Sequence, residues 1–216
     1  MYLSRLILNP RSQQVRRELS DPYQMHRTIM AAFPENLPAG ERVLFRIDGL
    51  DGGQSLALLV QSQNPPDWNH LLQPGKHYLL EDDQGDNPAV KSFDPSLKEG
   101  QSFRFRLRAN PTVKKDRDEK KQGRRVALLR EEEQLAWLKR KMQACGADIL
   151  GARVAHEGKN VAQMHRPGQI HKASLVAVRF DGILQVTEPE KFKDALRLGI
   201  GSAKGLGFGL LSLAPV

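Results

Sequence analysis

Apolar and polar residues alternate in four short stretches of the first half of the chain. This period-two pattern predicts strands at residues 2–9, 42–49, 55–63 and 101–109. One stretch, residues 22–33, has a helical period instead, and its apolar residues share one face: Met25, Ile29, Ala32 and Phe33. Residues 64–100 are rich in Pro, Gly and Asp, which predicts irregular structure with a short helix near 68–72. The order β-α-β-β-x-β is that of a ferredoxin-like unit with one poorly formed helix.

The second half of the chain repeats this order. Strands are expected at residues 126–129, 148–156, 172–180 and 208–213, with a short extended piece at 183–187 and helices at 131–145 and 188–198. We therefore predict an α+β protein of two tandem ferredoxin-like (RRM-like) βαββαβ domains with a C-terminal glycine-rich loop. The expected domains are residues 1–110 and 126–216, joined by a flexible, basic connection at 111–125. The prediction rests on the element order alone, because no residue-level repeat accompanies it.

The composition restricts the class of protein. The chain has 216 residues and one cysteine, Cys145, which excludes an intrachain disulfide and a cysteine-based metal site. Cys145 follows an apolar helix face, so we expect a buried structural thiol rather than a nucleophile. No apolar run approaches the roughly 20 residues that span a bilayer, and residues 1–8 are too short and too alternating for a signal peptide. We expect a cytoplasmic protein without a membrane partner.

The positive charge is concentrated in one stretch. Residues 104–141 hold 14 Lys and Arg against 6 Asp and Glu, a net charge of +8 that equals the net charge of the whole chain. Such a stretch is typical of a protein that binds a polyanion. A solvated linker with incidental charge is the alternative, and a membrane surface fits less well because no basic amphipathic helix accompanies the stretch. With 6% aromatic residues, the chain suits a double-stranded nucleic acid better than a single strand bound by stacking.

The start of the helix at residues 22–33 carries a candidate catalytic pair. Asp21 before Pro22 predicts an N-cap followed by proline at the first helical position. Tyr23 and His26, at i and i+3, are then neighbours near the helix N-terminus, which favours anions. RNA supplies its own nucleophile, the 2′-OH, so cleavage needs a base, an acid and donors for the phosphate, and a histidine suits either proton role. The alternative for His26 is an ordinary exposed surface histidine.

A glycine-rich loop lies near the C-terminus. It contains one lysine, Lys204, among five glycines: Gly199, Gly201, Gly205, Gly207 and Gly209. Glycine lets backbone N–H groups approach a ligand closely, so the loop suits a phosphate. It is not a Walker loop, because no Gly-Lys-Ser/Thr follows the spacer, and the order helix, glycine loop, strand is not a Rossmann fingerprint. A mobile turn is the alternative.

Other polar clusters indicate less. Residues 153–172 form a basic excursion that would touch phosphates, and its histidines lack metal spacing: His156, His165 and His171. An acidic run suggests Mg²⁺, although a solvated loop fits it better: Glu81, Asp82, Asp83 and Asp86. Two further histidines have no evident partner: His70 and His77. We therefore predict no metal site and no cofactor.

Motifs at both ends of the chain carry a family resemblance. The pattern Gly-hydrophobic-Gly, five residues, Gly-hydrophobic-Gly occurs as Gly199-Ile200-Gly201 and Gly207-Phe208-Gly209. Near the N-terminus stand Met1-Tyr2-Leu3-Ser4-Arg5 and Tyr23-Gln24-Met25-His26-Arg27. With these motifs the chain resembles, over its whole length, the CasE (Cse3) type of CRISPR repeat-processing endoribonuclease from type I-E systems. The glycine pattern is specific to the wider superfamily, and the Tyr-x-x-His pair to this branch.

The resemblance implies a fold, a reaction and partners. It implies two ferredoxin-like domains and a metal-independent cut at the 3′ base of the CRISPR repeat stem-loop, leaving a 5′-OH and a 2′,3′-cyclic phosphate (or 3′-phosphate). The enzyme would keep the mature guide RNA and join the other subunits of the surveillance complex Cascade.

The resemblance also implies roles for residues of this chain. His26 would be the acid–base residue, and Tyr23 would position or deprotonate the 2′-OH. The glycine loop with Lys204 would hold RNA or support the interdomain cleft, and the hairpin at 153–172 would enter the RNA groove. The cations expected to bind RNA are Arg27, Lys114, Lys115, Arg117, Lys120, Lys121, Arg124, Arg125, Arg153, Lys159, Arg166, Lys172 and Lys204.

Two other functions stay open on the residues alone. A non-catalytic RNA-binding module of the same fold would use His26 only to contact phosphate. A nucleotide-binding or metabolic enzyme would use the glycine loop for a small phosphate ligand, and would be expected to place an acidic or Mg²⁺-binding partner near that loop. The sequence offers no such partner.

Overall fold

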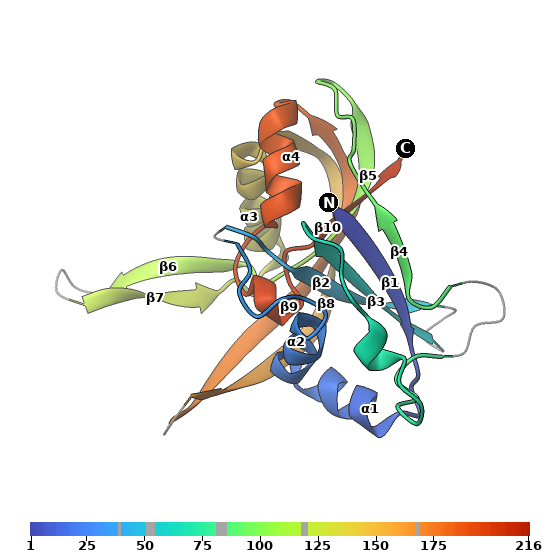
Figure 1. The fold of residues 1–216 in the computed structure, drawn as a ribbon. Helices are drawn as coiled ribbons and strands as arrows, with labels where there is room; N and C mark the ends of the chain where they lie inside the picture. Colours follow the sequence, from blue (N-terminus) through green and yellow to red (C-terminus); the bar gives the residue numbers. More distant parts are fainter. Residues whose placement is uncertain (39, 51–54, 81–85, 118–120, 167–168) are drawn as a thin grey trace.

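The computed structural model describes residues 1–216 apart from 39, 51–54, 81–85, 118–120 and 167–168. The described part contains two four-stranded antiparallel sheets, a separate two-stranded hairpin and four α-helices (Figure 1). In this part, no helix is both long and apolar enough to cross a membrane. The predicted fold class, two ferredoxin-like units in tandem, is confirmed.

The first sheet uses strands from the N-terminal half. Its order is β2 (Leu44–Leu50), β3 (Ser55–Ser62), β1 (Tyr2–Leu8) and β4 (Ala89–Ser92), with the first and third strands in the centre as in a ferredoxin-like sheet. Helices α1 (Gln13–Ser20) and α2 (Pro22–Met30) follow β1, and a single 3₁₀ turn, η2 (Asn69–Leu71), stands where the motif has its second helix. The sheet and α2 bury a common core that includes Leu6, Leu8, Met25, Ile29 and Leu58.

The second sheet repeats the arrangement. Its order is β10 (Leu211–Pro215), β5 (Ser102–Ala109), β9 (Gln169–Val186) and β8 (Ala147–Arg166). The helices α3 (Glu131–Ala144) and α4 (Pro189–Leu198) cover one face, and a 3₁₀ turn, η3 (Lys204–Leu206), precedes β10. Trp137 of α3 stacks on Phe180 of β9 with ring centroids 6.2 Å apart, in a core shared with Phe192 of α4.

The strand predicted at 101–109 exists but belongs to the other sheet. As β5 it pairs with β9 and β10, whereas β4, in a segment expected to be irregular, closes the first sheet. The cause is the apolar face of β5, where Phe105 and Leu107 pack into the core with α3 and α4. The prediction that this strand belongs to the first ferredoxin-like unit was therefore wrong. The domain limits stay a proposal, and this pairing favours a boundary between β4 and β5.

The stretch predicted as a flexible connection at 111–125 forms a hairpin of β6 (Thr112–Arg117) and β7 (Lys121–Ala127). The expected strand at 126–129 is the end of β7. The strands predicted at 148–156 and 172–180 extend into one long hairpin, β8 and β9, which also includes the piece at 183–187. Both hairpins project from the body of the molecule (Figure 1). Strand pairing with a partner nearby in the chain orders these segments despite their like charges.

The sequence pattern does not predict α1. This helix has only eight residues, and Val15 is its one fully buried apolar side chain. Its local signal is the N-cap, since the Ser12 hydroxyl accepts a hydrogen bond from the Val15 N–H at 3.5 Å. A short polar helix of this kind depends on tertiary contacts more than on its own periodicity.

Candidate active site

Helix α2 presents Tyr23 and His26 as the sequence predicts. The Asp21 carboxylate accepts a hydrogen bond from the Tyr23 N–H at 3.1 Å, and Pro22 occupies the first helical position. Met25 and Ile29 are fully buried and fix which face of the helix points inward. The rings of Tyr23 and His26 then lie on one side of the helix, with centroids 6.4 Å apart.

His26 is enclosed by the glycine loop. A Cβ at position 205 would stand 3.5 Å from Cε1 of His26 and 3.6 Å from Nδ1, so the imidazole lies directly against the Gly205 backbone. Nδ1 is buried and has no hydrogen-bond partner among the described residues. This burial lowers the pKa of His26 below its ordinary value. His26 is therefore not the ordinary exposed histidine that the sequence left open.

The glycine loop is a closed, packed structure. The Ile200 N–H donates to the Gly209 oxygen at 2.9 Å, and the Gly209 N–H donates to the oxygen of Arg108 at 2.8 Å. Gly209 has a φ of +87°, and a Cβ there would stand 2.8 Å from the oxygen of Ile200. Only glycine satisfies both constraints, so the alternative of a mobile turn does not describe this loop.

The loop also joins the two sheets. A Cβ at Gly199 would stand 2.8 Å from both methyl carbons of Leu44, and one at Gly207 would stand 3.1 Å from the ring of Phe45. Leu44 and Phe45 belong to β2 of the first sheet, whereas the loop leads from α4 into β10 of the second. On the other side, a Cβ at Gly201 would stand 3.2 Å from the ring of Trp137. The missing side chains thus let the loop fit between the two units.

Lys204 supports the loop from within. Its ammonium donates to the oxygen of Leu198 at 2.8 Å, at the C-terminus of α4, where a cation is favourable. Burial lowers the pKa of Lys204, and the neighbouring charge of Arg42 lowers it further. This contact accounts for Lys204 structurally, and a contact between Lys204 and RNA stays a prediction.

Arg108 holds the loop from β5, and sequence reasoning missed this role. Its guanidinium donates to the Gly207 oxygen at 3.1 Å and to Glu157 at 2.7 Å, and it lies 4.5 Å from the centre of the Phe208 ring. The available signal was the alternation of arginine with apolar residues along 103–108, which indicated only a strand with one basic face.

A buried arginine connects the two units. Arg46 of β2 is 2% exposed and forms two 2.8 Å hydrogen bonds with the Asp48 carboxylate. It also donates to the backbone oxygen of Arg106 in β5, to that of Leu210 just before β10, and to the Ser212 hydroxyl in β10. Beside it lies a cleft of about 1150 Å³. The arginines that line the cleft are Arg46, Arg104, Arg106, Arg153 and Arg179.

Apart from Lys204, the predicted RNA-binding cations fall into three groups. Arg27, on α2, is exposed and donates to Gln24 at 3.4 Å. On the first hairpin Lys114 pairs in register with Arg125, and both line a cavity of about 220 Å³ that Lys141 also lines. The other cations of that hairpin are placed only by backbone position: Lys115, Arg117, Lys121 and Arg124. Lys120 lies outside the described residues.

The third group lies on the long hairpin. Arg153 and Lys159 are exposed on β8, whereas Arg166 and Lys172 are placed by backbone position near the hairpin tip. The two hairpins and the cleft thus carry most of the predicted cations at separate places, and the structure does not gather all of them beside His26.

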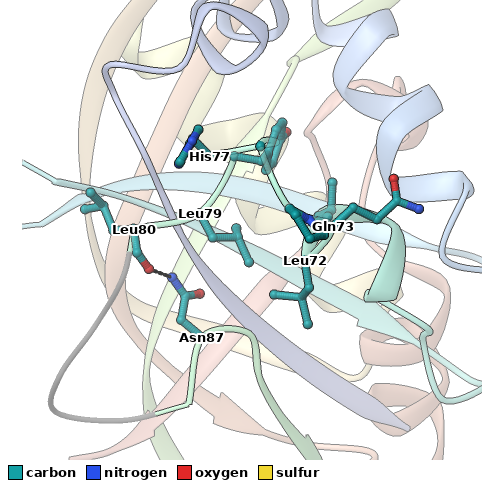
Figure 2. A pocket seen from close by; sticks show the side chains of 10 residues that line it. Leu72, Gln73, His77, Leu79, Leu80 and Asn87 are labelled. Carbon is teal, nitrogen blue, oxygen red and sulfur yellow. Dashed lines mark hydrogen bonds between the residues drawn. The ribbon is translucent and has the colours of Figure 1, made fainter.

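The remaining candidates lie elsewhere. No three His, Cys, Asp or Glu side chains of the described part gather as metal ligands, and three residues of the acidic run (81–83) lie outside that part. Cys145 is half-buried, and burial raises the pKa of its thiol. A separate cavity of about 290 Å³ is lined by residues 71–75, residues 77–80 and Asn87 (Figure 2). Its lining has no lysine or arginine among the described residues.

The sequence and the fold are similar to those of known proteins. The sequence matches the family described as CRISPR associated protein over residues 1–215. It is 38% identical to the CRISPR-associated endoribonuclease Cse3 of Thermus thermophilus and 30% identical to the CRISPR system Cascade subunit CasE of Escherichia coli, covering 100% of each chain in both alignments. Among solved structures it is similar to CRISPR endoribonuclease Cse3 bound to 19 nt RNA, with a TM-score of 0.81, 38% identity and 100% of both chains covered.

Proposed function

The chain belongs to the CRISPR-associated protein family, and from this membership we propose that it is an endoribonuclease that processes CRISPR repeat RNA. It cuts at the 3′ base of the repeat stem-loop, keeps the mature guide RNA and joins the other subunits of Cascade in the cytoplasm. Two full-length relatives support this proposal, one named an endoribonuclease and the other a Cascade subunit.

The reaction uses the 2′-OH of the RNA as the nucleophile. The 2′-oxygen gives up its proton and forms a bond to phosphorus, while the bond from phosphorus to the 5′-oxygen breaks. The leaving 5′-oxygen takes up a proton, so the products are a 2′,3′-cyclic phosphate and a 5′-OH. Every atom comes from the RNA and from protons exchanged with the protein, which makes positioned proton transfer the main requirement.

We assign the proton transfer to His26. Its lowered pKa keeps the imidazole neutral at neutral pH before RNA binds, so that it is able to accept a proton. Because Nδ1 is buried, Nε2 is the nitrogen left to reach the RNA. Tyr23, with its ring centroid 6.4 Å away, takes either the positioning or the deprotonation of the 2′-OH.

We assign RNA binding to the cationic hairpins and to the N-terminal end of α2. Lys114 and Arg125 face one cavity with Lys141, a group of three cations suited to a phosphate. Binding of this kind is largely electrostatic and recognises an RNA stem through its backbone and shape.

The observation that carries the proposal is the contact between His26 and Gly205, which joins the two motifs of the family resemblance at one place. The test is incubation of a repeat-containing transcript with the protein in EDTA, followed by analysis of the end groups. We expect one cut per repeat, with a 5′-OH and a 2′,3′-cyclic phosphate (or 3′-phosphate). A protein that binds the transcript and never cuts it would instead be the non-catalytic module, and a cut that requires a divalent cation would contradict the proposed chemistry.

A further inference from the structure

A buried carboxylate lies where α1, α2 and the segment before β4 meet. Glu18 of α1 is 4% exposed, and both of its oxygens are occupied by uncharged donors. Oε1 accepts from the Thr28 hydroxyl at 2.6 Å and from the Gln14 amide at 2.9 Å, and Oε2 accepts from the Tyr78 hydroxyl. Hydrogen bonds to a charged acceptor in a buried site are strong and directional.

One of these donors belongs to the helix that carries the candidate catalytic pair. Thr28 lies two residues after His26 on α2, a helix of only nine residues. Met25 and Ile29 hold α2 against the core mainly through apolar contacts, which are not directional, and the Tyr78 hydroxyl also lies 3.3 Å from the weakly accepting Met25 sulfur. The hydrogen bond from the Thr28 hydroxyl to Glu18 is a directional contact that restricts the orientation of α2. His70 adds a second such contact, because its Nε2 lies 3.1 Å from the backbone oxygen of Thr28. Thr28 is therefore held on two sides.

The other end of the network is anchored to the first sheet. Tyr78 is fully buried, and its backbone carbonyl oxygen accepts from the Asn9 N–H at 2.9 Å, while the Leu80 N–H donates to the backbone oxygen of Ile7 of β1 at 2.9 Å. The Asn87 amide donates to the oxygens of Leu80 and Ile7, and Figure 2 shows the first of these bonds. Burial raises the pKa of Tyr78, and Glu18 raises it further, so the phenol remains a donor.

We propose that Glu18 is a positioning residue for RNA cleavage, linking the fixed phenol of Tyr78 to Thr28 and thereby setting the orientation of α2 and of the His26 ring against Gly205. This inference rests on the proposed function, because it assigns Glu18 an effect on the cleavage step. The carboxylate touches neither RNA nor His26, so its influence passes through the helix. A displacement of about 1 Å in a catalytic group costs up to roughly 10²-fold in rate.

The chain offers a matched pair of variants. Thr28→Val removes the hydroxyl that ties α2 to Glu18 while keeping nearly the same side-chain volume, and Thr28→Ser restores the hydroxyl. Gln14→Ala removes a donor to the same carboxylate oxygen, but that donor lies on α1 and has no link to α2. Because none of these three changes empties a large core volume, all three variants are expected to fold, and thermal unfolding checks this.

The experiment measures two quantities for each variant with a repeat transcript: the single-turnover cleavage rate constant, and the Kd for a transcript with a 2′-deoxy nucleotide at the cut site. For Thr28→Val we expect the rate constant to fall at least about 10-fold while Kd stays within about 2-fold. Thr28→Ser should recover most of the rate, and Gln14→Ala should remain within about 2-fold of the unchanged protein. In a His26→Ala background, Thr28→Val should have no further effect on residual cleavage.

Cleavage by Thr28→Val at the original rate would overturn the inference. So would a loss of rate by Thr28→Val that is equally large in the His26→Ala background, because such a loss would come from a general change in stability and not from His26. A readout without RNA separates this inference from the proposed function. The pKa of His26, followed by NMR in the free protein, should rise toward its ordinary value in Thr28→Val and stay unchanged in Gln14→Ala. If this shift occurs but the unchanged protein cuts no transcript, the proposed function fails while the positioning of His26 stands; an unmoved pKa contradicts the positioning itself.

Discussion

The imidazole of His26 lies on the backbone of Gly205, with 3.5 Å between Cε1 and the position of a Cβ at residue 205. His26 comes from α2 beside the first sheet, and Gly205 from the loop that leads into the second. The contact buries Nδ1 and so determines which ring nitrogen faces outward. The active site we propose thus exists only when the two units are docked together.

A larger side chain at position 205 is expected to displace the ring. A methyl group fits, because its contacts at 3.5 and 3.6 Å are ordinary van der Waals distances. We expect Gly205→Ala to cleave within about 3-fold of the original rate and Gly205→Leu to cleave roughly 10²-fold more slowly, since the longer side chain must push the imidazole aside. Single-turnover rates of the two variants check this, and equal rates would contradict the assigned contact.

The lowered pKa of His26 gives a direction for the pH dependence. If the neutral imidazole accepts the proton of the 2′-OH, protonation at low pH removes the base. We therefore expect kcat/KM to rise with pH and to level off, with a midpoint below the ordinary histidine value of 6.5. The measurement is kcat/KM between about pH 4.5 and 8 at constant ionic strength. A rate that falls with rising pH through this range would assign His26 the role of the acid instead.

Because the glycine loop is tightly packed, a side chain added at one of its glycines is expected to lower the free energy of unfolding. Gly209 and Gly100 both have positive φ values, +87° and +79°, but a Cβ meets the oxygen of Ile200 only at Gly209. Gly100→Ala should lower the free energy of unfolding by about 1 to 2 kcal/mol through backbone strain alone. Gly209→Ala should lower it by about 3 kcal/mol or more, because the clash adds to the same strain. Denaturant unfolding of both variants separates the effect of backbone strain from that of the clash. Equal losses of unfolding free energy would show that the loop moves enough to relieve the clash.

RNA binding through the hairpins is expected to depend steeply on salt. If about six phosphates are contacted, Kd should increase by roughly 10³-fold between 50 and 200 mM salt. Arg125→Gln should weaken binding and reduce the slope of log Kd against log salt by about 1. Lys98→Gln, an exposed cation on the connection between β4 and β5, is the control and should leave the slope unchanged. A flat salt response would contradict electrostatic recognition.

The fold could be predicted where the signal is local. Asp21, Pro22 and the apolar face of α2 specify that helix, and the structure confirms its start at Pro22. The residues of β5 show that it is a strand, but they do not show which sheet it joins. That choice depends on where Phe105 and Leu107 find a core, and the core is built from residues far along the chain.

The site could be predicted as a set of residues but not as an arrangement. The i, i+3 spacing places Tyr23 beside His26, because one helix carries both. The contact of His26 with Gly205, the support of the loop by Arg108 and the bonds from Arg46 to the second unit all join residues from different elements. Periodicity carries no information on such pairs, and the basic residues of 112–125 even suggested a flexible connection where β6 and β7 pair.

The most direct test of the account replaces His26. We compare the unchanged protein, His26→Ala and the control His77→Asn, a variant at a positive φ that asparagine tolerates. Single-turnover cleavage of a repeat transcript is measured in EDTA, together with Kd for the 2′-deoxy transcript. We expect His26→Ala to lose at least about 10²-fold in rate with Kd within about 2-fold, and His77→Asn to lose nothing. Full-speed cleavage by His26→Ala, or no cleavage by the unchanged protein once divalent cations are chelated, would contradict it.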